Sequence, residues 1–195
     1  MPDLSHLNNY LVGSYFLNRV LGGAGFQTPD RSRAFFLNLI RLTDKTLGEY
    51  EETRTHLQRY VDSPNKTSLL LKCTGHMENC IDSLHRLFKH ASKLRNRLHT
   101  LEKQTGQPVP KLDWKKLPKK KETDRIEHIR HAIQHMDDRI SEGKAGEGIS
   151  YIGLHVMSDS IELDGEIVYH RELAAWTQQV HKVAEQLVAY VPTAS

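Results

Sequence analysis

The segment from Thr67 to about Glu102 carries the strongest hydrophobic pattern of the chain. Apolar side chains recur there every seven residues in two interleaved series, which are Leu70, Met77, Leu84, Ala91 and Leu98, and Cys73, Cys80, Leu87, Leu94 and Leu101. This spacing places one apolar seam along an α-helix of about ten turns, as in a coiled coil. A seam of that length needs helical partners, so it predicts an all-α fold, an antiparallel bundle of long helices. The pattern is compatible with partners in the same chain and with partners in a second subunit.

Three other segments fit the same bundle. Pro29 and Asp30 favour the start of a second long helix, whose apolar residues continue to about Asp62. A final helix is expected from about Arg171 to Tyr190, and a shorter one within residues 5–21, where a group of glycines follows.

One short part of the chain has β-strand character. Asp164 and Gly165 separate two short apolar runs, which is the pattern of a β-hairpin. We therefore expect a small β-hairpin at about residues 150–169, inserted before the last helix. With 195 residues, the whole chain is expected to form a single helical domain, residues 1–195.

Composition argues against a membrane protein. Hydrophobic residues make up 38% of the chain, and mean hydropathy is −0.56. Apolar runs stay well short of the roughly 20 residues of a membrane helix, and the start of the chain lacks a signal-peptide pattern. We therefore expect a cytoplasmic protein with no membrane partner. The two cysteines, Cys73 and Cys80, lie on the apolar seam and are expected to be buried, reduced thiols.

Residues 104–121 cannot form a continuous helix, because they contain three prolines. The segment is rich in lysine and is predicted to be a basic loop, which Trp114 fixes to the body of the protein. The lysines would suit contacts to RNA phosphates, and Trp114 would suit base stacking. The candidates are Lys115, Lys116, Lys119, Lys120 and Lys121. An ordinary solvated loop is the other interpretation of this segment.

The segment from Lys121 to Glu142 is the best candidate for chemistry. Isoleucines and a methionine form one apolar stripe of a predicted helix, in the order Ile126, Ile129, Ile133, Met136 and Ile140. The opposite face carries His128, His131 and His135. Such a helix is expected to bury one edge and to present a polar surface along the other.

Within this helix, Arg130 and His135 form the motif R-x4-H in the sequence RHAIQH. The motif, with His131 directly after the arginine, resembles the signature of the HEPN family, named for its occurrence in higher eukaryotes and prokaryotes. In architecture the resemblance extends over roughly residues 67–190. It departs from the family where Asp137 stands two residues after the histidine, because members paired with a nucleotidyltransferase antitoxin often have tyrosine there.

The resemblance implies a metal-independent endoribonuclease of toxin or defence type, composed across a homodimer, with an antitoxin protein as a candidate partner. His135 would act as general acid or base on the ribose 2′-hydroxyl, and Arg130 would stabilise the charge developing on phosphate. His131 and Asp137 would assist. No cofactor and no metal are implied.

Three other interpretations of the same helix stay open. The chain can be a non-catalytic helical module that dimerises, or that binds RNA or a nucleotide. The histidine face can be an ordinary solvated surface. The third interpretation is a metal site formed by His128, His131 and His135, although the paired Glu-x-x-His pattern of di-metal bundles is missing.

Overall fold

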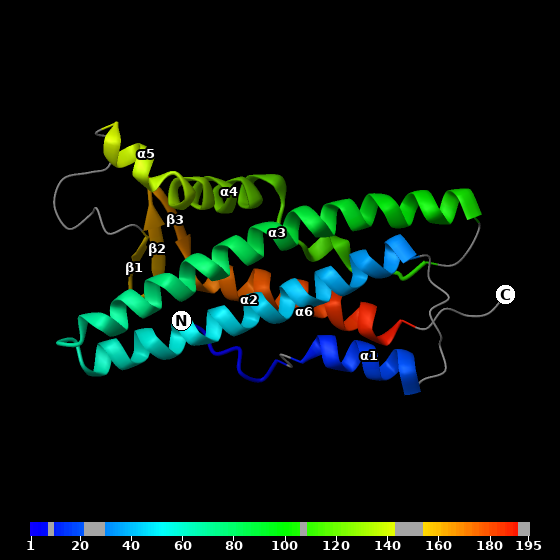
Figure 1. Ribbon diagram of the computed structural model, residues 1–195, viewed down its shortest axis with the longest axis horizontal. Helices are drawn as coiled ribbons and strands as arrows, with labels where there is room; N and C mark the ends of the chain where they lie inside the picture. The colour runs from blue at the N-terminus through cyan, green and yellow to red at the C-terminus, as the bar shows by residue number, and fades with distance from the viewer. Residues whose placement is uncertain (8–9, 22–29, 106–108, 143–153, 191–195) are drawn as a thin grey trace.

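The computed structural model describes residues 1–7, 10–21, 30–105, 109–142 and 154–190. It is mostly helical, with a small antiparallel sheet before the last helix (Figure 1). The elements are α1 (Leu11–Leu21), α2 (Asp30–Asp62), α3 (Thr67–Thr105), the 3-10 turn η1 (Trp114–Lys116), α4 (Lys120–Gln134), α5 (Met136–Ser141), β1 (His155–Val156), β2 (Ser160–Leu163), β3 (Glu166–Tyr169) and α6 (His170–Ala189). The predicted all-α fold with a small β-insertion is therefore confirmed.

Helices α2 and α3 form the long antiparallel pair that spans the molecule (Figure 1). A tight turn joins them, in which the amide of Lys66 donates a hydrogen bond to the carbonyl of Ser63 at 3.1 Å. Eight of the ten heptad side chains of α3 are buried, and Leu70 and Leu101, at its two ends, are half-buried. The seam predicted from the seven-residue repeat thus packs against α2 of the same chain.

Helices α1 and α6 complete the bundle. Trp176 of α6 packs edge-on against Phe88 of α3, with ring centroids 6.3 Å apart. The carboxylate of Asp44 accepts hydrogen bonds from the amides of Leu11 and Val12, at 3.2 and 2.9 Å, and so satisfies the open N-terminus of α1. This contact fixes α1 against α2.

The β-insertion is a three-stranded antiparallel sheet in the order β1-β2-β3. Asp164 and Gly165 form the turn between β2 and β3 with positive φ angles of 56° and 75°, as a two-residue hairpin turn requires. The predicted hairpin is therefore present, and β1 adds a third strand within the range expected for the insertion, whose residues 150–153 lie outside the described residues. Paired Ile161 and Val168 are both buried and join the sheet to the helical core.

The helix expected from Lys121 to Glu142 is in fact two helices, which meet at His135. This residue has φ −109° and ψ 26°, and the chain turns there from α4 into α5. Asp137 and Asp138 occupy the first turn of α5, where carboxylates favour a helix N-terminus. Ile126 and Ile129 are buried as expected, but Ile140, beyond the break, is 49% exposed. The apolar stripe therefore faces the core only along α4.

Cys73 and Cys80 are buried and unpaired, as predicted, and burial raises the pKa of Cys80 to about 12. Such thiols are protonated and unreactive. Among the described helices, none combines the length and apolar character that crossing a membrane requires.

Candidate functional site

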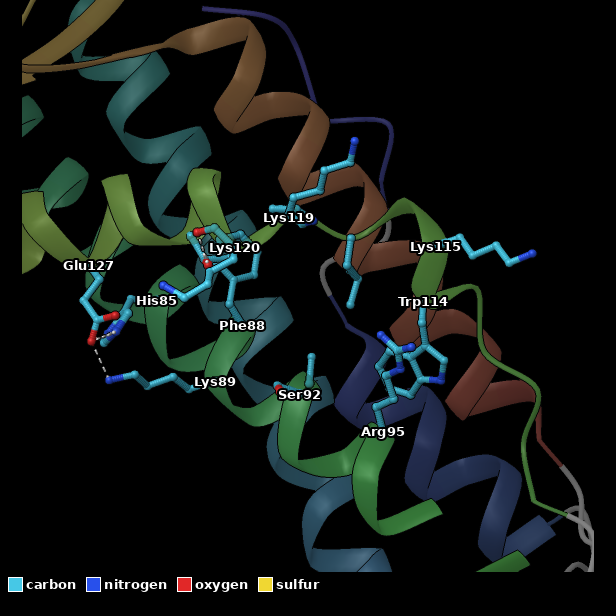
Figure 2. A pocket seen from close by; sticks show the side chains of 14 residues that line it. His85, Phe88, Lys89, Ser92, Arg95, Trp114, Lys115, Lys119, Lys120 and Glu127 are labelled. Atoms are coloured by element: carbon cyan, nitrogen blue, oxygen red, sulfur yellow. Dashed lines mark hydrogen bonds and ion pairs between the residues drawn. The ribbon is translucent and has the colours of Figure 1, made fainter. Parts of the chain in front are cut away.

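A pocket of about 630 Å³ lies where the basic loop returns against α3 and α4 (Figure 2). Its described lining includes five cationic side chains, which are Lys89, Arg95, Lys115, Lys119 and Lys120. Trp114 and Arg95 lie together at one end, and His85, Glu127 and Lys89 lie at the other (Figure 2). The volume is within the usual range for small-molecule sites.

The local sequence explains how the loop reaches this position. Leu112 is buried, and the amide of Asp113 donates a hydrogen bond to Oε1 of Gln186 in α6 at 3.1 Å. The 3-10 turn that follows places the half-buried indole of Trp114 against the core. Trp114 therefore fixes the loop to the body of the protein, as the sequence predicts.

The charges of the pocket are only partly compensated. Nζ of Lys89 contacts Oε1 of Glu127 at 2.8 Å, and Nζ of Lys120 contacts Oδ2 of Asp124 at 2.6 Å. Within the described part of the chain, Arg95, Lys115 and Lys119 make no ion pair. Lys115 and Lys119 extend outward at the rim (Figure 2). The pocket thus presents uncompensated positive charge to an incoming ligand.

His85 adds a polar group to the inner wall. It is 4% exposed, and its Nε2 lies 3.6 Å from Oε1 of Glu127. Burial lowers the pKa of His85, and the charges of Lys89 and Arg130 act in the same direction. The hydrogen bond from Lys89 lowers the pKa of Glu127. At neutral pH the wall therefore offers a neutral imidazole beside a carboxylate, a pair able to accept or donate hydrogen bonds to a ligand.

The two residues of the R-x4-H motif point in different directions. Nε of Arg130 donates to Oδ1 of Asp82 in α3 at 2.9 Å, and its side chain is only 19% exposed. His135 stands at the junction of α4 and α5 with its side chain 60% exposed. No hydrogen bond or ion pair joins Arg130 to His135 in the described structure. Arg130 links α4 to α3, and His135 faces outward.

His131 and His135 form an exposed histidine face at the end of α4, as expected. The rings of His131 and His135 stack, with centroids 6.1 Å apart and planes inclined by 12°. Nδ1 of His135 lies 3.2 Å from Oδ2 of Asp138, whereas Asp137 uses its backbone carbonyl to accept a hydrogen bond from Ser141. Of the two acids, Asp138 is therefore the one beside His135, although Asp137 was the one predicted to assist.

Glu127 connects this face with the pocket. Its Oε1 lies 3.8 Å from Nε2 of His131 on the outer side of α4, in addition to its contacts with Lys89 and His85. The histidine face and the basic pocket are therefore neighbouring parts of one surface.

The lysines of the loop divide between two hollows. Lys115 and Lys119 line the main pocket, Lys121 lines a neighbouring one with Arg125 and His128, and Lys120 lines both. Lys116 belongs to the 3-10 turn, and its side chain lies outside the described part of the structure.

No family model, curated protein or solved structure matches this chain. The resemblance to the HEPN family thus rests on the R-x4-H motif and the helical architecture, and it stays a prediction. His85 and Glu127 were not predicted as pocket residues, because their positions in α3 and α4 do not reveal that the loop returns to line the same hollow.

Proposed function

We propose that the protein binds RNA in the basic pocket. The observation that carries the proposal is the combination of uncompensated cations with a half-buried indole in one hollow, from Arg95, Lys115, Lys119 and Trp114. Cationic side chains hold the phosphate backbone, and an aromatic face accepts any unstacked base.

The indole in the pocket favours single-stranded RNA over a duplex. A duplex keeps its bases stacked, so a base reaches an indole only from a single strand, a loop or an end. The pocket of about 630 Å³ has room for one nucleotide, and His85, Ser92 and Glu127 supply hydrogen-bonding groups along its wall. The phosphates on either side of this nucleotide would lie against Arg95 and the rim lysines.

Replacing Arg95 and Lys119 together by glutamine should weaken binding of a fluorescently labelled oligoribonucleotide about tenfold at moderate salt. The reason is the loss of two phosphate contacts. The slope of log Kd against log salt should also fall by about 1.4, which is 0.7 for each contact to a single strand. Fluorescence anisotropy measures both quantities.

A matched control replaces Lys45 and Arg59 by glutamine, since both are exposed on α2 and outside the pocket lining. This variant has the same net charge as the pocket variant, and its binding should stay close to that of the parent. In Trp114→Ala, affinity should fall with little change in the salt slope, because stacking is lost and the charges remain. Equal losses in the pocket variant and the α2 control would show that binding follows net charge alone and would contradict the site.

A second candidate function is RNA cleavage by an exposed histidine pair, and the stacked His131 and His135 favour it. One neutral imidazole would take the proton of a ribose 2′-hydroxyl as that oxygen attacks phosphorus. The bond to the 5′-oxygen would break, and the second, protonated imidazole would give this oxygen its proton. The products would be a 2′,3′-cyclic phosphate and a 5′-hydroxyl. In this hypothesis Arg130 stabilises phosphate charge, the unit is a homodimer, and an antitoxin protein is a possible partner.

The cleavage hypothesis predicts that the parent cuts mixed cellular RNA in EDTA and that His135→Ala reduces the rate at least a hundredfold, the usual contribution of an acid or base. His128→Ala is the matched control, because His128 lies on the same helix face and pairs with Asp164 at 2.8 Å instead. Gel analysis of RNA length gives the rates. Intact RNA in the presence of the folded parent would leave binding as the function of this surface.

A further inference from the structure

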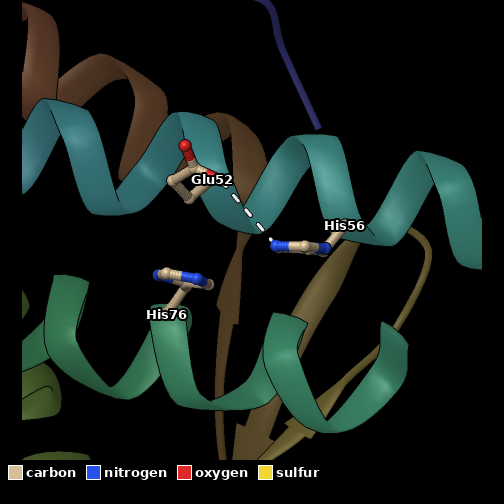
Figure 3. A group of neighbouring side chains, drawn as sticks. All are labelled: Glu52, His56 and His76. Atoms are coloured by element: carbon tan, nitrogen blue, oxygen red, sulfur yellow. Dashed lines mark ion pairs between the residues drawn. The ribbon is translucent and has the colours of Figure 1, made fainter. Parts of the chain in front are cut away.

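A cluster of metal-ligating side chains lies between α2 and α3 (Figure 3), and none of its residues lines the basic pocket. It comprises Glu52 and His56 of α2 and His76 of α3. Each offers one ligand atom, and these atoms lie within 4.8 Å of one another. The cluster is therefore independent of the proposed RNA site.

The antiparallel helix pair brings these residues together. Glu52 and His56 are four residues apart and so lie on one face of α2, with Oε2 of Glu52 3.8 Å from Nε2 of His56. His76 approaches from α3, and its ring stacks on that of His56 with centroids 5.3 Å apart and planes inclined by 9°. The three side chains thus converge from two helices on one small volume (Figure 3).

A fourth residue orients His76 in the way found at metal centres. Nδ1 of His76 lies 2.8 Å from Oε2 of Glu49, within hydrogen-bond distance of that carboxylate. The carboxylate favours the tautomer with its proton on Nδ1, which leaves the lone pair of Nε2 available to an ion. Histidines that bind metals almost always donate their other ring N–H to a carboxylate, a carbonyl or water.

His56 is a second, independent indication of a ligand. It is 9% exposed, and its buried Nδ1 has no hydrogen-bond partner among the described residues. A buried ring nitrogen without a hydrogen-bond partner is costly, and an ion bound to that nitrogen would remove the cost.

We propose that Glu52, His56 and His76 bind one divalent transition-metal ion, with zinc as the best match, and that Glu49 positions His76 from outside the coordination shell. Two imidazoles and one carboxylate form a donor set of zinc and its neighbours, whereas calcium and magnesium prefer oxygen alone. Zinc–nitrogen bonds of about 2.0 Å require ligand atoms about 3.3 Å apart, so modest side-chain rotations close the cluster around the ion. Water completes a four-coordinate shell.

The ion would connect α2 to α3 near the turn that joins them. This position gives it a structural effect that is measurable without any enzymatic assay. Ligands that bind only the folded state raise its stability by mass action, and a metal held by both helices does so in proportion to its affinity.

Isothermal titration of the EDTA-treated, dialysed full chain with zinc chloride tests the site. The parent should bind one equivalent at this site, and excess zinc should raise Tm by about 5 °C. Cobalt(II) should give the intense visible absorption of a four-coordinate ion. Glu52→Gln, His56→Ala and His76→Ala should each weaken zinc binding at least tenfold, and Glu49→Gln should weaken it about tenfold through His76.

His99→Ala is the matched control, because His99 is an exposed histidine of α3 outside the cluster. His131→Ala tests the other histidine pair. Zinc binding that is unchanged in Glu52→Gln and His76→Ala, or that is lost in His131→Ala instead, overturns the assignment. Absence of any zinc-dependent heat or Tm shift in the parent overturns it equally. Because Glu52 is exposed, its replacement by glutamine keeps the fold and isolates the ligand effect.

Discussion

Replacing Leu84 by alanine should lower the free energy of unfolding by about 3 kcal/mol. Leu84 occupies a heptad position of α3, is fully buried, and belongs to the core cluster shared by α3 and its neighbours. The substitution removes apolar contacts and leaves a cavity, because the surrounding side chains relax only in part. Urea unfolding followed by circular dichroism measures the loss.

Leu71→Ala on the same helix is the control that separates the stability lost through burial from the stability lost through a change in helix propensity. Leu71 is 54% exposed, so the substitution has the same chemistry and the same change in helix propensity but removes little buried surface. We expect a change of no more than about 0.5 kcal/mol. Similar losses for the two variants would contradict the packing of α3 described above.

The long helices could be predicted from the sequence because their apolar residues repeat regularly. A seven-residue repeat is a local property of the chain, and burial follows directly from it once a partner helix is available. This explains why α2, α3 and α6 were predicted nearly to their ends. The turn at Asp164 and Gly165 was predictable for a similar reason, since the residue types determine which φ angles are accessible.

The break at His135 was not predictable from periodicity. Met136 and Ile140 continue the apolar spacing of α4, yet the chain turns before them and exposes Ile140. The local signal was the pair of acids after His135, which suits the start of a new helix as well as the polar side of a continuing one. The residue types are therefore compatible with both outcomes, and periodicity alone does not separate them.

The sites depend on contacts between distant parts of the chain. His56 lies in α2 and His76 in α3, on either side of the turn that joins the two helices, and which side chains meet across this pair depends on the rotation and register of the helices. The basic pocket likewise requires the loop to fold back over α3. Arg130 shows the opposite case, since a short motif suggested catalysis while a partner on another helix, Asp82, holds the side chain at 2.9 Å.

Lowering the pH from 7 to 5 should remove about 2 kcal/mol of stability through His170 alone. Burial lowers the pKa of His170 from 6.5 to about 4, and the charged amino group of Met1 adds to the shift. His170 is also the first residue of α6, where the helix dipole disfavours a positive charge.

The sign follows from where the proton binds. Below pH 6.5 the unfolded chain protonates His170, whereas the folded protein does not until the pH approaches 4. Stability is therefore fully present above pH 6.5 and is lost as the pH falls toward 4. The His170→Gln variant has no titrating group at this position. The unfolding free energy of the parent minus that of the variant should therefore fall by about 2 kcal/mol between pH 7 and pH 5.

Urea unfolding at the two pH values measures this difference, with His99→Gln as the exposed control. Buried His85 and half-buried His90 also have a lowered pKa, so acid destabilises the parent by more than His170 contributes. Comparing parent and variant cancels these shared effects. A difference in unfolding free energy between parent and variant that is the same at pH 7 and pH 5 would contradict this prediction. It would mean that His170 has the same pKa in the folded and unfolded states and is not enclosed at the start of α6.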